Sequence, residues 1–109
     1  MTVPSGGIPA DGHSQVAVKI RLLDPTNQPI RGAVPVTLEA SLGRWQVEDR
    51  DPVEPGIQTV VEGGEVTYGL VASPREGLGE LRVTTDQGSQ LVEVAFVPAA
   101  RPLIAAGLL

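Results

Sequence analysis

The stretch Ser14–Leu23, SQVAVKIRLL, decides the fold class of this chain. Its apolar side chains recur at every second position, as Val16, Val18, Ile20 and Leu22. Successive side chains of a β-strand point to opposite faces, so this alternation predicts a strand with one face in a core and the other in solvent.

The same alternation returns along the rest of the chain between breaks that are rich in glycine, proline and acidic residues. It predicts further strands over 34–38, 43–47, 57–61, 66–70, 81–85 and 91–97. No segment shows a sustained 3.6-residue apolar period, which an amphipathic helix would require. Short strands separated by turns at this spacing predict an all-β sandwich or barrel of about seven to eight strands.

Three features predict how these strands connect. Gly63-Gly64 predicts a hairpin between 57–61 and 66–70, and Gln87-Gly88 predicts one before 91–97. Pro35 has no N–H to donate to a ladder, so it predicts a short or irregular strand at a sheet edge or a bulge.

Composition limits the functions that this chain could have. Its 109 residues carry a net charge of −5, which is the wrong sign for binding nucleic acid or anionic lipid. The chain has no cysteine and one histidine, so thiolate catalysis, thiolate-bound zinc and imidazole metal sites are excluded. We therefore predict a single non-enzymatic domain with no cofactor, no metal, no nucleic-acid partner and no direct membrane insertion.

The chain is expected to divide into three parts. Residues 1–7 read as a linker or a lead-in strand, because they have neither the basic nor the apolar region of a signal peptide. Residues 8–98 form the sandwich. Residues 99–109 read as a linker or the start of a next element, since their apolar run is shorter than the ~20 residues of a membrane-spanning helix.

Asp11, His13 and Ser14 contain the three residue types of a hydrolase triad within four positions. In a strand-like stretch, however, Ser14 points away from His13, whereas a triad needs its nucleophile and base within hydrogen-bond reach. We interpret the segment as a turn that leads into the first clear strand.

A candidate binding region lies around the longest irregular segment. Its candidate residues are Arg44, Trp45, Glu48, Asp49, Asp51 and Glu54. Tryptophan and arginine are frequent at binding hot spots, and clustered carboxylates suit Ca²⁺, although the spacing matches no known calcium loop. The alternatives are that Trp45 covers one end of the sandwich and that the acidic residues are simply solvated.

Several segments together resemble a known family. These are residues 10–14 before the first strand, 23–24 with 29–36, 64–68 and 77–83. In this order and spacing they resemble the bacterial immunoglobulin-like domain, group 1, of invasin and intimin. The resemblance spans roughly residues 8–97 and implies an immunoglobulin-like β-sandwich that carries no catalytic residues.

The sequence therefore leads to two functional hypotheses. The first is a structural spacer or interaction module of a larger exported bacterial protein at the cell surface, outer membrane or periplasm, with neighbouring domains of the same chain as partners. The alternative is an adhesive or carbohydrate-binding module that uses Trp45 and the acidic segment to bind a host or surface protein or a glycan. A hydrolase accessory domain ranks third.

Overall fold

The computed structural model describes residues 1–3 and 6–98, and the predicted linker at 99–109 lies outside this part of the chain. All regular elements in the described residues are β-strands. In chain order they are β1 (Ile8–Pro9), β2 (Gln15–Arg21), β3 (Ala33–Ala40), β4 (Arg44–Gln46), β5 (Ile57–Glu62), β6 (Glu65–Val71), β7 (Gly77–Thr85) and β8 (Gly88–Val97). The all-β prediction is confirmed.

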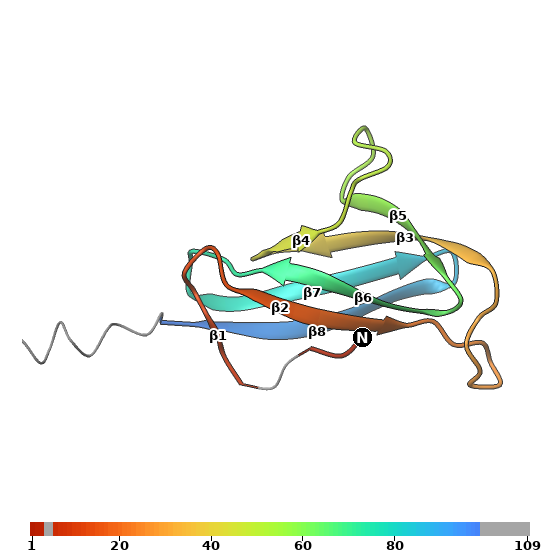
Figure 1. Ribbon diagram of the computed structural model, residues 1–109, viewed down its shortest axis with the longest axis horizontal. Helices are drawn as coiled ribbons and strands as arrows, with labels where there is room; N and C mark the ends of the chain where they lie inside the picture. Colours follow the sequence, from red (N-terminus) through yellow and green to blue (C-terminus); the bar gives the residue numbers. More distant parts are fainter. Residues whose placement is uncertain (4–5, 99–109) are drawn as a thin grey trace, which may run out of the picture.

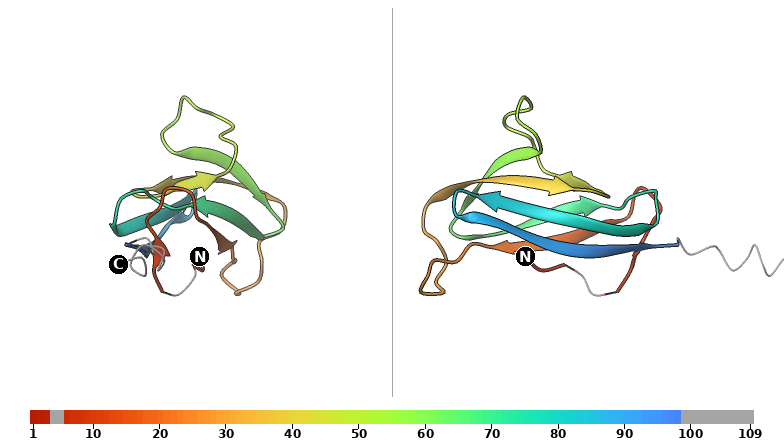
Figure 2. Two further views of the ribbon diagram at one scale, coloured as in Figure 1. Left: turned by 60° about the vertical axis from the view of Figure 1, so that its left-hand side comes forward. Right: turned by 180° about the vertical axis from the view of Figure 1, so that it is seen from behind.

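The strands form two sheets that face each other (Figures 1 and 2). One sheet has the order β1-β8-β7-β3-β5, and the other has the order β2-β6-β4. The N-terminal segment joins both sheets along one side, because Thr2 pairs with Lys19 of β2 and β1 runs parallel to β8. The molecule is therefore a two-layer sandwich, as the strand count predicted.

The core lies between the inward faces of both sheets. Its largest fully buried side chains are Ile20, Leu38, Leu70, Leu81, Val18 and Val61. Each fully buried aliphatic side chain contributes about 1.5–3 kcal/mol relative to its exposed state, so alternation along each strand becomes the main source of stability.

One predicted hairpin is wrong. Gly63 and Gly64 do link β5 to β6, but β5 pairs with β3 whereas β6 pairs with β2 and β4 in the opposite sheet. The link therefore carries the chain from one layer to the other. A pair of glycines permits either path, because both connections need positive φ angles. The β7–β8 hairpin is confirmed, with Thr85 directly opposite Gly88.

The prediction for the Pro35 strand is also wrong, since β3 has eight residues and lies between β5 and β7. Pairing with β7 covers only Thr37–Ala40, however. The N–H of Ser41 donates to Glu80 at 3.0 Å, which shows that odd-numbered residues of this segment turn their backbone groups toward β7. The nitrogen of Pro35 thus faces a side where no strand is paired, so its missing donor breaks no ladder bond.

Candidate functional site

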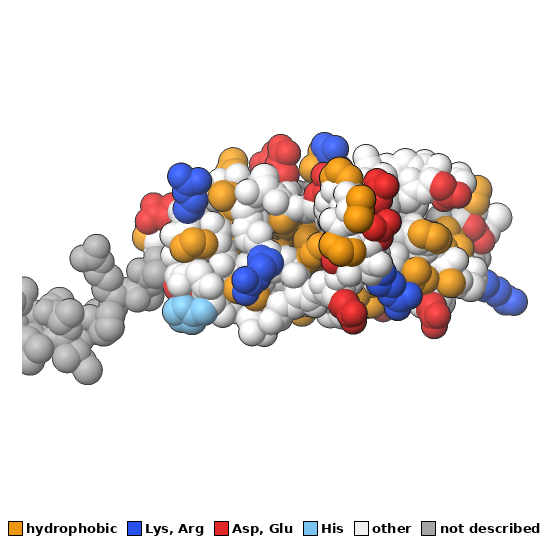
Figure 3. Space-filling model, turned by 90° about the horizontal axis from the view of Figure 1, so that it is seen from above, with side chains coloured by type: hydrophobic (Ala, Val, Ile, Leu, Met, Phe, Trp, Pro, Cys, Tyr) orange, Lys and Arg blue, Asp and Glu red, His pale blue; other side chains and the backbone are white. Residues whose placement is uncertain are grey.

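The predicted binding region lies on one segment that stands out from the sandwich. Residues 47–56, here called the acidic loop, leave β4 in one sheet and enter β5 in the other (Figure 1). Seen from above, acidic and apolar side chains lie next to each other on this side of the molecule (Figure 3). The loop is thus the main projection from the described part of the chain.

The structure separates Arg44 from Trp45, because consecutive residues of β4 point to opposite faces. The Arg44 side chain is exposed, whereas Trp45 keeps 4% of its surface exposed. The indole Nε1–H of Trp45 donates to the carbonyl of Glu39 at 3.0 Å, and its ring meets Tyr68 edge-on with centroids 6.5 Å apart. Glu39 belongs to the other sheet, so Trp45 joins the two layers at the base of the loop.

Asp49 and Asp51 direct their carboxylates toward the loop's own backbone. Asp49 Oδ1 accepts the N–H of Asp51 and the N–H of Gln58, both at 3.0 Å. Asp51 Oδ1 accepts the N–H of Val53 at 3.3 Å, and its carbonyl accepts the N–H of Glu54 at 3.2 Å. These bonds explain why the chain has aspartate at the two positions, since a short carboxylate can close such turns.

The same loop covers part of an open sheet edge. The N–H of Gly63 donates to Gly32 of the β3 side, so by alternation Gln58 turns its backbone groups away from β3. The Asp49 carboxylate accepts the N–H of Gln58, and the carbonyl of Gln58 accepts the N–H of Arg50 at 2.8 Å. Edge strands with unpaired backbone groups favour pairing with other chains, so this cover limits such pairing.

The remaining loop side chains face solvent. Glu48 and Glu54 are exposed, and Val53 at the tip keeps 89% of its surface exposed. Within residues 1–3 and 6–98, no three acidic or histidine side chains come together in a way that could hold a metal ion. What the loop offers a partner is an ordered projection with an apolar tip and carboxylates beside it.

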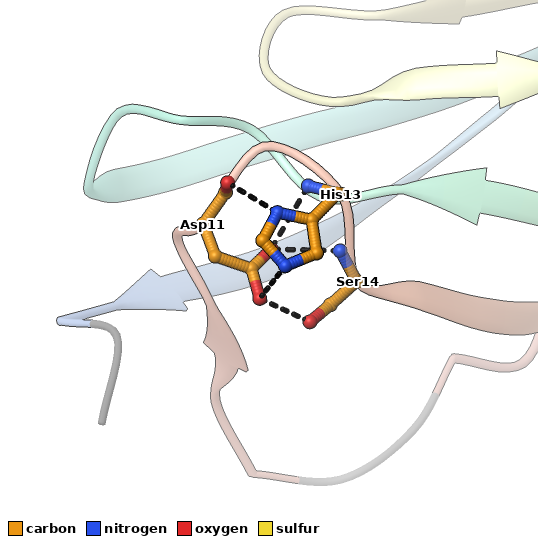
Figure 4. Close-up of polar contacts among 3 residues, drawn as sticks. All are labelled: Asp11, His13 and Ser14. Atoms are coloured by element: carbon orange, nitrogen blue, oxygen red, sulfur yellow. Dashed lines mark hydrogen bonds and ion pairs between the residues drawn. The ribbon is translucent and has the colours of Figure 1, made fainter. Parts of the chain in front are cut away.

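Asp11, His13 and Ser14 form a hydrogen-bonded turn at the start of β2 (Figure 4). Asp11 accepts the backbone N–H of His13 at 2.9 Å and that of Ser14 at 2.7 Å, and the Ser14 hydroxyl also donates to it. The Ser14 hydroxyl and the Ser14 N–H hold the pKa of Asp11 well below its ordinary value. Serine thus bonds to aspartate directly rather than to histidine, an arrangement that activates no nucleophile.

Asp24 closes a similar turn in the segment after β2, where its residue type predicts a turn. Its Oδ1 accepts the N–H of Thr26 at 2.9 Å, the Thr26 hydroxyl at 2.6 Å and the N–H of Gln28 at 3.0 Å. These bonds, led by the Thr26 hydroxyl, lower the pKa of Asp24. The signal was present in the Asp-Pro-Thr-Asn order, which is typical of a turn.

An open depression of about 920 Å³ lies beside the unpaired part of β3. Its lining includes Met1, Leu22, Ile30, Val34 and Asp86. None of the six sequence-predicted binding residues lines it, so the depression and the acidic loop are separate features. No helix in the described part of the chain is long and apolar enough to cross a membrane.

The fold and these turns define a two-sheet β-sandwich in which carboxylate and hydroxyl side chains of the turns bind the backbone. Its fold is similar to that of the immunoglobulin-like sandwiches of invasin-type proteins. The adhesin InvE of Yersinia pseudotuberculosis matches with a TM-score of 0.65 and 22% identity over 89% of this chain. Invasin, a bacterial integrin-binding protein, matches with a TM-score of 0.67 and 20% identity, also over 89%. The resemblance predicted from sequence is confirmed for the fold.

A β-glucuronidase from glycoside hydrolase family 2 matches as well, with a TM-score of 0.70 and 14% identity over 94% of this chain. The chain spans 25% of the InvE structure, 18% of invasin and 11% of the glucuronidase. No protein-family model and no curated protein sequence matches this chain. The same fold therefore occurs in an adhesin, an integrin-binding protein and an enzyme, and each of these three chains is much longer than this one.

Proposed function

We propose that this domain is a non-catalytic structural spacer or interaction module of a larger exported bacterial protein. Its place would be the cell surface, the outer membrane or the periplasm, and its first partners would be neighbouring domains of the same chain. The sandwich of residues 8–98 would form the module, with residues 1–7 and 99–109 as connections on either side.

The observation that carries this proposal is the use of the polar groups. Asp11, Asp24, Asp49 and Asp51 each accept backbone N–H groups of their own turns. Carboxylates committed in this way fix the loops. A continuous apolar core between two sheets, closed by ordered turns, suits a unit that keeps its neighbours at a fixed distance.

Replacing the domain within its parent protein tests the proposal. An unrelated immunoglobulin-like sandwich of equal length would be placed between the same neighbouring segments, and surface display and ligand binding by the whole protein would be measured. A spacer predicts that both are retained, whereas a deletion of the domain reduces them. Loss of ligand binding with display intact would instead show that this domain itself contacts a ligand.

The acidic loop supports a second candidate, an adhesive or carbohydrate-binding module. The loop is ordered by its own hydrogen bonds, and it presents Val53, Glu48 and Glu54 to solvent. An ordered loop loses little conformational entropy when it binds. The partner would be a host or surface protein or a glycan.

The single tryptophan of the chain provides the test of this candidate. Trp45 is buried at the base of the loop, so its fluorescence reports changes there. Glycans and Ca²⁺ would be titrated into the protein, with a Glu48→Ala/Glu54→Ala variant as the matched control. A saturable change in the fluorescence of wild type that the variant lacks supports binding by the loop. An unchanged fluorescence spectrum of wild type favours the spacer function.

A further inference from the structure

The outer face of the three-stranded sheet, here called the basic face, carries an excess of cations. Its outward side chains are Gln15, Ala17, Lys19, Arg21, Arg44, Gln46, Glu65 and Thr67. Lys19 lies 2.9 Å from Glu65, and Arg21 lies 3.6 Å from the same carboxylate. The basic face therefore carries three cations and one anion, since Arg44 is also exposed on it.

The outer face of the five-stranded sheet, here called the acidic face, has the opposite charge. Its outward side chains over β3, β7 and β8 include Glu39, Leu78, Glu80, Arg82, Leu91, Glu93 and Ala95. Three carboxylates thus surround one guanidinium. The strands β7 and β8 of this face are in front when the molecule is seen from behind (Figure 2, right).

Two carboxylates of the acidic face lie in an unfavourable register. Glu80 of β7 is the direct cross-strand partner of Glu93 of β8. Like charges directly opposite each other on one face destabilise a sheet. The ion pairs within the described residues involve neither carboxylate. The two glutamates therefore carry uncompensated negative charge, which a cationic surface outside the domain would neutralise.

Two leucines on the same face lie beyond this pair in both directions along the strands. Leu78 keeps 67% of its surface exposed and Leu91 keeps 53%. Arg82 and Leu91 are cross-strand partners, as are Leu78 and Ala95. A partner that covers the glutamates also removes these leucines from water, which adds an apolar contribution to the electrostatic one.

Two parts of the five-stranded sheet are protected against strand-to-strand addition. The acidic loop covers the open side of β5 at Gln58, and Pro35 removes a donor from the unpaired part of β3. The side of β8 that faces away from β7 is paired only at Phe96 and Val97, so strand pairing there is the competing mode of self-association, which the charge-reversal variants below distinguish from a face contact.

From this charge complementarity we infer that copies of this chain associate face to face, the basic face of one copy on the acidic face of the next. The contact is heterologous, so each copy keeps one free face and association continues into short rows instead of stopping at a closed dimer. Cationic side chains of the basic face lie over the Glu80–Glu93 pair of the neighbour. The inference is independent of the spacer function and adds a lateral contact between copies.

Sedimentation velocity of the purified domain tests the inference. At low ionic strength, the weight-average sedimentation coefficient is expected to rise steadily with protein concentration. In about 0.5 M NaCl, where the Debye length is about 4 Å, the rise should diminish because the charges are screened. A wild-type protein that stays monomeric at every concentration overturns the inference.

Charge reversal identifies the faces. Two variants are compared with wild type, Glu80→Lys/Glu93→Lys and Lys19→Glu/Arg44→Glu. The association constant of each should fall by about tenfold or more. Mixing the two variants should restore association, because the reversed face of each fits the reversed face of the other and the unchanged faces still match. Association of wild type that neither variant weakens overturns the inference.

A matched control separates the face contact from a change in net charge. Glu76→Lys/Asp86→Lys alters the net charge as much as Glu80→Lys/Glu93→Lys does, but it lies in turns away from both faces. It should associate like wild type, and equal weakening in both variants contradicts the proposed contact. Circular dichroism checks that each variant folds. If the Glu80→Lys/Glu93→Lys variant does not fold, Glu80→Gln/Glu93→Gln replaces it. This neutral variant should weaken both the association and its salt dependence.

Discussion

The Oδ1 atom of Asp49 lies 3.0 Å from the backbone nitrogen of Gln58, nine residues further along the chain. This bond attaches the acidic loop to the open edge of β5. Because the carbonyl of Gln58 accepts the N–H of Arg50, both backbone groups of this edge residue are satisfied. The Asp49 carboxylate, which the sequence predicted as a candidate for ligand binding, therefore covers a sheet edge.

Replacing Asp49 by alanine should lower the free energy of unfolding by about 1 kcal/mol, since two backbone N–H groups lose their acceptor. Urea denaturation measures the loss. Limited proteolysis should also cut Asp49→Ala faster within residues 50–55 than it cuts wild type. Glu48→Ala is the control, because Glu48 is exposed and should change neither property. Equal behaviour of both variants would show that the Asp49 bonds contribute nothing.

Ile20 tests the strand alternation of β2. Its side chain is 2% exposed in the core, so Ile20→Ala should destabilise the domain by about 2–5 kcal/mol through lost burial and a residual cavity. Leu91→Ala removes an exposed side chain and should cost at most about 0.5 kcal/mol. Chemical denaturation of both variants gives the comparison, and a loss near zero for Ile20→Ala contradicts the core assignment.

Gly63 and Gly64 form a matched pair for the link between the two sheets. Both have positive φ, of 73° and 76°, so an alanine is strained at either position. A Cβ on Gly64 would lie 2.8 Å from the backbone of Ile30, whereas one on Gly63 meets open space. Gly64→Ala should therefore lose about 2 kcal/mol more stability than Gly63→Ala. Thermal melting of the two variants measures both losses of stability. Equal losses would mean that the Ile30 backbone moves to accommodate the added Cβ at no cost.

Asp11 predicts a loss of stability in acid. Its folded-state pKa is lowered by the bonds from Ser14 and His13, while its ordinary value is 3.8. A carboxylate whose pKa is lower in the folded state stabilises the fold above its ordinary pKa. This stabilisation is lost as the pH falls below the ordinary pKa toward the folded-state pKa. The stability advantage of wild type over Asp11→Asn should thus be larger at about pH 6 than at about pH 3.

Denaturation midpoints at both pH values measure this difference. Ser14→Ala removes the hydroxyl donor and should reproduce part of the effect. An advantage that stays constant with pH would show that the Asp11 turn is not linked to folding.

Most strands could be predicted from the sequence because their signal is local. The alternation over residues 15–21 gave β2, and the breaks around Pro52 and Pro74 bound the strands on either side. The resemblance to invasin-type domains added the sandwich architecture. What failed was pairing, since Gly63-Gly64 suits a hairpin and a crossing between layers equally well.

The binding region could be predicted only in part. Tryptophan next to arginine left two interpretations open, a partner anchor and a cover for one end of the sandwich, and strand alternation turns Trp45 inward while Arg44 faces solvent. The N–H groups that donate to Asp49 belong to Asp51 and Gln58, and only the folded loop brings the second of these within reach. Binding by Glu48 and Glu54 stays a prediction that the fluorescence titration tests.

The amino-acid sequence by itself determined where strands form and which side of each is apolar, because period-two burial depends on neighbours along the chain. Tertiary structure alone decided which sheet β5 and β6 join, why Pro35 is tolerated within β3, and that the outer faces carry opposite charge. These properties depend on residues far apart in sequence that meet only when both layers close over one core.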